Sequence, residues 1–249
     1  MSGHSKWSKV KHFKGAVDTK RSKLFTKLVR EITVAAKMGG ADPDGNPRLR
    51  LAINTAKANS MPKDTVDRAI KKATGEGDNT TYEEVVYEGY GPGKFAVIAE
   101  CLTDNRNRTA SVIRTIFNKG HATLGSSNSV LFLFERKGTI VVPKSAGNEE
   151  QMTDLVLESG AEDLEDLGDE WLIKCSLEAF GQARAFVEGK GIAIKSAELS
   201  RIPTTTVALK DKDSAEKAIG FVESLEDEDD VQNVYTNFDI PDAILQQLS

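Results

Sequence analysis

The sequence has few of the residues that mark metal binding, redox chemistry or membrane insertion. It contains three histidines and two cysteines in 249 residues, and no apolar run approaches the roughly 18 residues of a membrane-spanning helix. Cys101 and Cys175 each lie in an apolar, strand-like run without CxxC spacing, so we expect reduced, packed thiols. The lysine-containing start has no apolar core and does not resemble a secretory signal. Together these features favour a cytoplasmic chain without a membrane partner.

Catalytic motifs are missing as well. The sequence has no GxSxG, HExxH or phosphate-loop pattern, and His121 lies in a Gly-containing turn without an evident partner. Gly91-Pro92-Gly93 lacks nucleotide-binding spacing and is typical of a hairpin turn, and His4 and His12 have no companion ligands for a metal. We therefore expect no enzyme activity, no catalytic residue, no metal, no cofactor and no small-molecule substrate.

What the sequence does have is charge separated by position. Residues 1–77 hold 17 Lys and Arg against 7 Asp and Glu, a net of +10, whereas residues 78–249 hold 16 against 31, a net of −15. The overall net charge of −5 conceals this division. Clustered Lys and Arg supply most of the non-specific affinity for nucleic acid, because they bind phosphates. The basic block therefore predicts a nucleic-acid partner for the N-terminal third.

The N-terminal third favours three helices. Residues 18–38 place Leu24, Leu28 and Ile32 among an apolar stripe at helical spacing, with lysines and arginines on the opposite face and Gly39-Gly40 as the stop. A second helix is expected to begin after Asn46, with Pro47 in its first position, and a third near Pro62. Three short amphipathic helices bury their stripes against one another, which predicts a bundle within residues 1–77.

The remainder alternates strands and helices, so we predict an α+β fold. Residues 129–204 follow the order β-α-β-β-α-β of a ferredoxin-like domain, with two strand-like runs expected around Arg136-Lys137-Gly138. Residues 78–128 and 205–249 are each too small to bury a core alone, and pairing them gives a second α/β sandwich. We therefore predict an N-terminal three-helix bundle followed by two ferredoxin-like sandwich domains, of which 129–204 is inserted into the other.

The candidate nucleic-acid contacts lie in the N-terminal arm and on the bundle. Lysines of the arm suit phosphates, and its aromatic rings suit stacking on unpaired bases. A solubilising tail and an ordinary solvated helix face remain alternatives for these two groups, and nothing here selects a base. The candidates are His4, Lys6, Trp7, Lys9, Lys11, His12, Lys14, Lys20, Arg21, Lys23, Lys27, Arg30, Arg48 and Arg50.

Two further charged segments each suggest a role. Asn105, Arg106 and Arg108 begin a predicted helix and form a candidate anion or partner site, the alternative being a capped turn in which Arg108 pairs with Asp104. The acidic run 226–230 follows another predicted helix and is expected to be a solvated loop, or a flank that repels nucleic acid.

Several long strings resemble the YebC/PmpR family from end to end: GHSKW, FTKLVREI, AAKMGGADPDGNPRLRLAI, MPKDTVDRAIKKATG, YEGYGPG and LTDNRNRT. The resemblance implies an N-terminal helical bundle and two α+β domains, the third inserted into the second. The sequence departs from the family pattern at Lys94, where the family usually has another glycine, and in the turns 118–122 and 126–128.

The resemblance also implies a function. The family is usually described as DNA-binding transcriptional regulators, while mitochondrial relatives look like translational activators and some bacterial members are linked to ribosomes stalled on proline-rich stretches. The expected function is thus non-enzymatic nucleic-acid binding by a DNA-binding transcriptional regulator. The alternative is a translation factor associated with ribosomal RNA. A flexible arm bearing aromatic residues supports it, because such an arm suits irregular RNA better than a DNA groove.

Overall fold

The structure is a computed structural model that describes residues 17–75 and 80–248, with side chains described from residue 21 onward. It has an α+β fold and forms two compact units. One unit spans Phe134–Ile202, and the other combines the described residues before and after it in the sequence. None of the described helices is both long and apolar enough to cross a bilayer.

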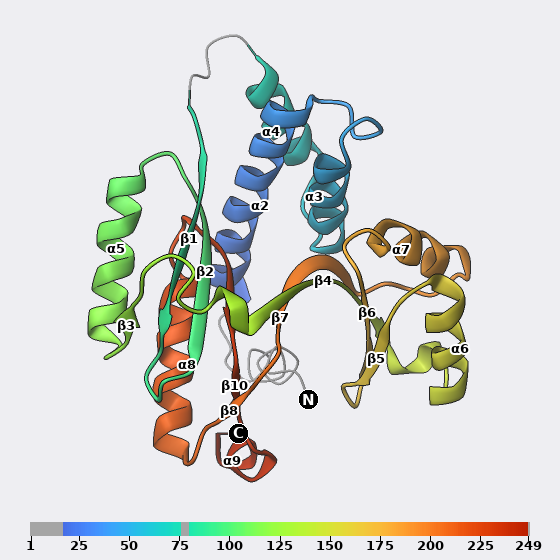
Figure 1. Cartoon of the computed structure of the whole chain (residues 1–249). Helices are drawn as coiled ribbons and strands as arrows, with labels where there is room; N and C mark the ends of the chain where they lie inside the picture. The colour runs from blue at the N-terminus through green and yellow to red at the C-terminus, as the bar shows by residue number, and fades with distance from the viewer. Residues whose placement is uncertain (1–16, 76–79, 249) are drawn as a thin grey trace. The chain divides into compact units, whose positions relative to one another are not determined.

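The three predicted N-terminal helices form (Figure 1), and their apolar stripes contribute to one buried cluster. The stripe of the first helix buries Leu28, Ile32 and Ala36, but Leu24 is 37% exposed, so the buried stripe begins one turn later than expected. Leu49 is fully buried among these side chains. The bundle consists of α2 (Val17–Gly39), α3 (Pro47–Ala58) and α4 (Lys63–Thr74).

Asn46 fixes the corner between α2 and α3. Its Oδ1 accepts the N–H of Leu49 at 3.0 Å and caps α3, while its Nδ2 donates to the carbonyl oxygens of Ala35 at 2.7 Å and Gly40 at 2.9 Å. A Cβ at Gly39 would lie 2.6 Å from that Nδ2, and Gly40 has a φ of +88°. The buried side-chain amide of Asn46 therefore requires glycine at position 39, and the backbone before it favours glycine at position 40.

The larger unit also contains an antiparallel sheet in the order β3-β1-β2-β9, with α5 and α8 covering one face (Figure 1). This order differs from the ferredoxin-like order predicted for this part of the chain. The strand expected at 205–209 is short and pairs in parallel with β10 instead of joining the sheet, and a C-terminal helix was not predicted. The elements are β1 (Glu83–Tyr90), β2 (Ala96–Thr103), α5 (Arg106–Lys119), β3 (Thr123–Leu124), β8 (Val207–Ala208), α8 (Lys212–Glu226), β9 (Val231–Thr236), β10 (Phe238–Asp239) and α9 (Asp242–Leu248).

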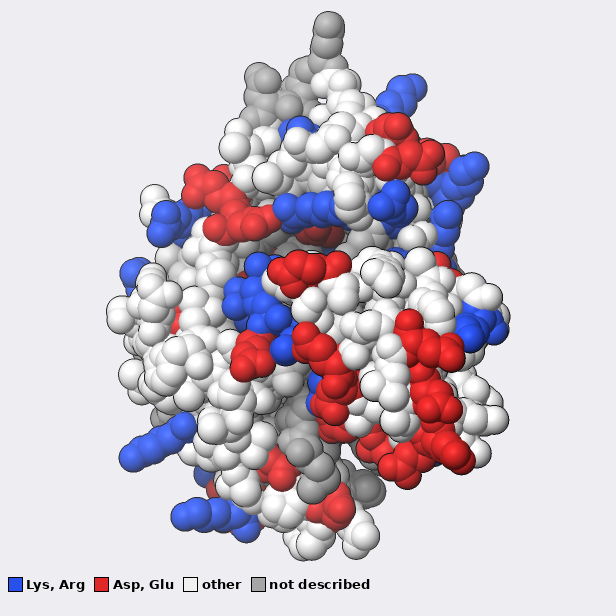
Figure 2. Space-filling model, turned by 45° about the vertical axis from the view of Figure 1, so that its right-hand side comes forward, with Lys and Arg blue, Asp and Glu red and all other residues white. Residues whose placement is uncertain are grey.

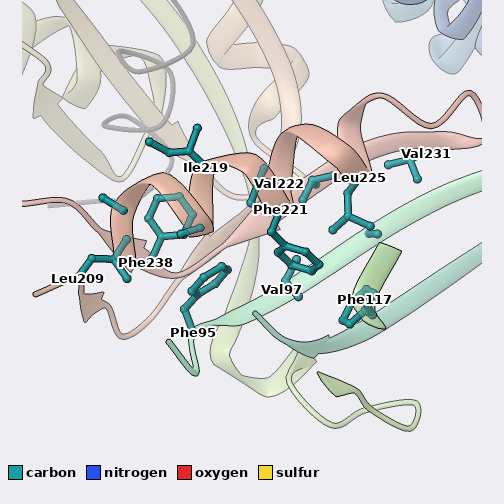
Figure 3. Close-up of a cluster of buried hydrophobic side chains, with 14 of the residues drawn as sticks. Phe95, Val97, Phe117, Leu209, Ile219, Phe221, Val222, Leu225, Val231 and Phe238 are labelled. Atoms are coloured by element: carbon teal, nitrogen blue, oxygen red, sulfur yellow. The ribbon is translucent and has the colours of Figure 1, made fainter. Parts of the chain in front are cut away.

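Four phenylalanines lie among the aliphatic side chains of the core between this sheet and its helices (Figure 3). The ring centroids of Phe95 and Phe238 lie 4.9 Å apart, and those of Phe117 and Phe221 lie 5.2 Å apart, both in edge-on geometry. All four side chains are at most 3% exposed. Phe117 comes from α5 and Phe221 from α8, so the core joins chain segments that precede and follow the inserted unit in the sequence.

The Phe134–Ile202 unit has the predicted order β-α-β-β-α-β, and its sheet order is β5-β6-β4-β7. This order matches a ferredoxin-like split βαβ arrangement. One of the two strand-like runs expected at its start is instead a 3₁₀ turn, η1 (Leu131–Leu133), so only one strand crosses Arg136-Lys137-Gly138. The unit contains β4 (Phe134–Pro143), η2 (Lys144–Ala146), α6 (Glu149–Ser159), β5 (Asp163–Asp166), β6 (Glu170–Cys175), α7 (Phe180–Gly189) and β7 (Ser196–Pro203).

Candidate nucleic-acid interface

Three of the predicted cations on α2 contact the acidic run 226–230. Lys23 Nζ lies 3.0 Å from an Asp227 carboxylate oxygen, and Lys27 Nζ donates to the carbonyl oxygen of Glu226 at 2.6 Å. Arg30 Nη1 donates to the Asp230 carboxylate at 2.8 Å and to the carbonyl oxygen of Asp229 at 2.7 Å. Because these cations lie four and three residues apart on one helix face, the run follows that face. The expectation of a merely solvated loop is therefore wrong.

Asp230 is the centre of this contact, with only 3% of its side chain exposed. Its carboxylate accepts hydrogen bonds from the hydroxyls of Thr109 at 2.6 Å and Thr103 at 3.2 Å, and from Arg108 Nη2 at 2.9 Å. Burial alone raises the pKa of Asp230, but these hydrogen bonds and the charges of Arg30 and Arg108 outweigh it and lower that pKa. The carboxylate is therefore a fixed internal anion.

The candidate anion site at the start of α5 thus already holds an anion from the same chain. Asn105 caps the helix by accepting the N–H of Arg108 at 3.0 Å, as one of the expected alternatives states. Arg108 pairs with Asp104 at 2.8 Å and also with Asp230. Arg106 is exposed and has no hydrogen bond or ion pair within the described residues. The arrangement therefore accounts for Arg108 without an external ligand, but not for Arg106.

The two predicted arginines of α3 differ in their surroundings. Arg48 binds both Glu31 carboxylate oxygens, at 2.7 and 3.1 Å, and also lies 2.6 Å from a Glu84 oxygen. These hydrogen bonds to Glu31 raise the pKa of Arg48 further above its ordinary value. Arg50 is exposed, and within the described part of the chain its guanidinium approaches only the carbonyl oxygens of Pro43 and Asp44, at 3.5 and 3.4 Å. Arg50 is therefore accessible to a ligand, whereas Arg48 is held by two carboxylates.

The bundle retains a set of cations that no carboxylate neutralises. Seven Lys and Arg side chains between residues 21 and 75 are exposed and form no ion pair within the described residues. Arg21 lies over the ring of Phe25, 5.3 Å from its centroid, and the others extend from α3, α4 or the turn between them. Figure 2 shows both signs of charge on one face of the molecule, with Asp and Glu gathered in runs low on the right. The seven are Arg21, Arg50, Lys57, Lys63, Arg68, Lys71 and Lys72.

The side chains of the remaining predicted contact residues lie outside the part of the chain that the structure describes. Lys20 belongs to α2, but its side chain is not described, and seven further candidates precede residue 17. Their contact with nucleic acid stays a prediction. They are His4, Lys6, Trp7, Lys9, Lys11, His12 and Lys14.

Other reactive side chains are enclosed. Burial raises the pKa of the Cys101 thiol to about 12 and also raises the pKa of Cys175, so neither thiol ionises readily near neutral pH. No group of three or more His, Cys, Asp or Glu side chains among the described residues is arranged to hold a metal ion.

Glu88 is a structural residue that the sequence did not single out. Its side chain is buried, 2% exposed, and accepts the backbone N–H groups of Asn128 at 2.7 Å and of Val130 and Leu131 at 2.9 Å. It thereby orders the segment that leads into the Phe134–Ile202 unit. A glutamate among the apolar residues of VVYEGY was the available signal, but the sequence does not identify its distant partners.

The fold and the surface define an α+β protein with a basic helical bundle at its N-terminal end and a partly neutralised cationic face. Residues 5–76 match the family model described as the TACO1/YebC protein N-terminal domain, and residues 82–238 match the model of the TACO1/YebC second and third domain. The chain belongs to the TACO1/YebC family, which confirms the resemblance to YebC/PmpR proteins.

Relatives of similar length support this assignment. A protein of Geobacter sp. (strain M21) is 50% identical over 248 residues, and one of Syntrophobacter fumaroxidans is 49% identical over 249 residues. Each alignment covers 100% of both chains, and both relatives are named "probable transcriptional regulatory protein". The crystal structure of the conserved hypothetical protein Aq1575 from Aquifex aeolicus is 44% identical and covers 93% of this chain and 95% of its own, with a TM-score of 0.84. The family is thus one of regulatory proteins by name.

Proposed function

We propose that this chain is a non-enzymatic, DNA-binding transcriptional regulator that contacts phosphates through its N-terminal arm and bundle. The observation that carries the proposal is the set of seven exposed cations on the bundle, none of which pairs with a carboxylate in the described chain. Each can exchange water and counterions for a phosphate without first breaking an internal ion pair. The relatives' names support the regulatory part of the proposal.

The internal contacts of the α2 cations change which residues we expect to bind phosphate. Lys23, Lys27 and Arg30 already contact carboxylates or carbonyl oxygens of the 226–230 run, so a phosphate at these positions must replace an internal partner. Replacing an exposed pair such as Lys23–Asp227 costs less than about 1 kcal/mol, whereas separating the buried Arg30–Asp230 pair costs several. We therefore place the principal contacts on the arm, Arg21 and the exposed α3–α4 cations, with Lys23 as a secondary contact.

The negative charge of the rest of the chain supports this assignment of the phosphate contacts to the N-terminal third. Residues 78–249 carry a net charge of −15, which repels a polyanion and directs it to the basic third. The field is screened beyond about 8 Å at physiological ionic strength. The bundle cations therefore determine the contacts, and the acidic remainder of the chain contributes orientation.

The test compares two variants with equal loss of charge. One replaces Arg21, Arg68 and Lys72 of the bundle by Gln, and the control replaces Lys94, Arg114 and Lys119, which are also exposed and unpaired in the described chain. Fluorescence anisotropy with a labelled DNA duplex should give a weaker affinity for the bundle variant only. Equal loss in both variants would attribute binding to net charge and would contradict the proposal.

The same cations would serve a translation factor bound to ribosomal RNA, the second candidate function. The observation that favours it is the combination of lysines with Trp7 and Phe13 in the arm, because unpaired RNA bases stack on aromatic rings. Crosslinking in cells, followed by parallel sequencing of bound DNA and RNA, separates the two. Enrichment of promoter DNA supports the transcriptional function, and ribosomal RNA as the main product supports the second candidate.

A further inference from the structure

The bundle carries an open groove of about 620 Å³ on its surface. The groove runs along α4 from Lys63 to Thr74 and is bordered on its other side by α3 and by the loop before α3. Eleven helical steps of about 1.5 Å make it about 16 Å long, which equals three turns of a helix. Its size and shape suit an elongated ligand.

The floor of the groove is aliphatic. Met61 and Val66 are nearly buried, at 6% and 5% exposure, while Ile53 and Ile70 are half-buried and pack against the bundle core. Pro43 and Ala41 close one end. The lining contains no aromatic ring, and its only hydroxyl is that of Thr74.

The rim is cationic. Lys57 of α3 and Lys63 and Lys71 of α4 line the groove, together with a single carboxylate, that of Asp67. The three lysines are exposed, and their ammonium groups form no hydrogen bond or ion pair within the described residues. An aliphatic floor under a rim of three lysines and one aspartate complements a ligand that is apolar on one side and negatively charged beside it.

These two properties distinguish between classes of ligand. A nucleic acid would supply the negative charge, but unpaired bases are held by aromatic stacking or by hydrogen bonds to their edges, and this floor offers neither. An amphipathic helix would insert aliphatic side chains at i, i+4 and i+7 into the floor and would place carboxylates against the lysines. The chain's own arm is rich in lysine and would meet charge of the same sign at the rim.

We propose that the α3–α4 groove binds an acidic amphipathic helix of a partner protein, so that the bundle recognises a protein as well as nucleic acid. The groove lysines Lys57, Lys63 and Lys71 bind carboxylates of that helix. Of the seven exposed cations of the bundle, Arg21, Arg50, Arg68 and Lys72 do not line the groove and remain available for phosphates while the helix is bound. Lys57, Lys63 and Lys71 cannot bind a phosphate and a helix carboxylate at the same time, so a bound helix confines the phosphate contacts of the bundle to the other four. The inference goes beyond the proposed function, and the two triple variants separate the failure of one from the failure of the other.

The experiment uses the full-length chain and a fluorescein-labelled helical peptide of about 18 residues, with leucines at i, i+4 and i+7 and glutamates beside them. A scrambled peptide of the same composition is the ligand control. Ala41→Trp fills one end of the groove without changing the charge, and Ala58→Trp places the same ring at an exposed position that does not line it. The two charge variants are the Gln triples at Lys57, Lys63 and Lys71 and at Arg21, Arg68 and Lys72.

Saturable binding of the patterned peptide is expected. Ala41→Trp should weaken it at least about tenfold because the ring occupies space that the helix needs, and the groove triple should do so because it removes the partners of the helix carboxylates. Ala58→Trp and the Arg21, Arg68 and Lys72 triple should leave it unchanged. Equal binding of the scrambled peptide, or no effect of Ala41→Trp, would overturn the inference.

Three other occupants give distinct results, each of which would contradict the inference. If Ala41→Trp weakens binding of a labelled single-stranded RNA and leaves the peptide unaffected, the groove is a nucleic-acid site and the inference is wrong. If the peptide binds only after residues 1–16 are removed, the chain's own arm occupies the groove. A dimer in light scattering that Ala41→Trp dissociates would identify a second copy as the occupant, again contrary to the inference.

Discussion

Asp230 joins the helical bundle to the sheet of the larger unit, so its replacement should loosen this unit selectively. Its carboxylate binds Arg30 of α2 at 2.8 Å, Arg108 of α5 at 2.9 Å and the hydroxyl of Thr109 at 2.6 Å. Asp230→Asn keeps the shape and one acceptor oxygen but removes the charge. Asp227→Asn is a matched control, because Asp227 pairs with Lys23 on the same helix while its side chain is 62% exposed.

The expected cost follows from burial. Removing one partner from a buried ion pair costs about 3–5 kcal/mol, because it leaves the other charge without compensation. Arg30 is 17% exposed, whereas Arg108 is 49% exposed and keeps Asp104, so only Arg30 is left poorly compensated. With one amide oxygen still accepting from Thr109, we expect Asp230→Asn to lower the free energy of unfolding by about 2–3 kcal/mol. Asp227→Asn should lower it by less than about 1 kcal/mol, as is usual for an exposed pair.

Urea unfolding can separate the two units. Trp171 lies in the Phe134–Ile202 unit and is 2% exposed, so in a Trp7→Phe background its fluorescence reports that unit alone. Circular dichroism at the same urea concentrations reports all helices. Asp230→Asn should shift the dichroism transition to lower urea and leave the Trp171 transition in place. Equal shifts for the Asp230 and Asp227 variants would refute the reasoning, since the burial of Asp230 would then have no energetic consequence.

The same network predicts a pH dependence. The folded-state pKa of Asp230 lies below its ordinary value, so the carboxylate contributes stability in full above the unfolded pKa of about 3.9. This contribution is lost as the pH falls through the lower, folded-state pKa. The wild-type and Asp230→Asn proteins should therefore differ in stability at pH 7 and converge at acid pH. A constant difference down to pH 2 would contradict the assignment.

Three further predictions concern packing and reactivity. Glu88→Ala removes the acceptor of three backbone N–H groups and should cost about 3 kcal/mol in urea unfolding, and Glu88→Gln less, whereas equal stability of Glu88→Ala and wild type would contradict this role. Gly39→Ala should lower the free energy of unfolding by about 2 kcal/mol, because its Cβ would lie 2.6 Å from Asn46. As a control, Gly220→Ala in α8 meets open space and should raise the free energy of unfolding by up to about 1 kcal/mol. A change of the same sign in both variants would refute the packing argument. Cys101 should not react with a thiol reagent at pH 8 until the chain unfolds, and rapid labelling of the native protein would show that its burial is misassigned.

Local structure was predictable where the sequence carries explicit start and stop signals. The helices α5 and α6 carry such signals at both ends, because Asn105 and Asn148 cap their first turns and Gly120 and Gly160 follow their last residues. Residues 131–133 are rich in strand-forming residues, yet they form a 3₁₀ turn beside the N–H groups that Glu88 accepts. Propensity in a run this short was overridden by a tertiary contact.

The candidate site was predictable only in its charge. The separation of basic and acidic residues along the chain is visible in the sequence, but their pairing is not. Lys27 and Glu226 are 199 positions apart, and no local pattern relates them. The acidic run was therefore interpreted as a solvated loop, whereas it binds the cations of α2 through Asp230 and its neighbours. Arg50 of α3 is among the residues predicted from the sequence, but the sequence does not show which cations of α3 and α4 stay exposed and unpaired.

The most direct test of phosphate binding by the bundle is the salt dependence of DNA affinity. For duplex DNA, the slope of log K against log salt changes by about 0.9 for each phosphate contact. Replacing Arg21, Arg68 and Lys72 by Gln should therefore make the slope about 2.7 units less steep than in the wild-type chain. The control at Lys94, Arg114 and Lys119 should keep the wild-type slope. An unchanged slope in the bundle variant would contradict the claim that its exposed cations bind the phosphodiester backbone.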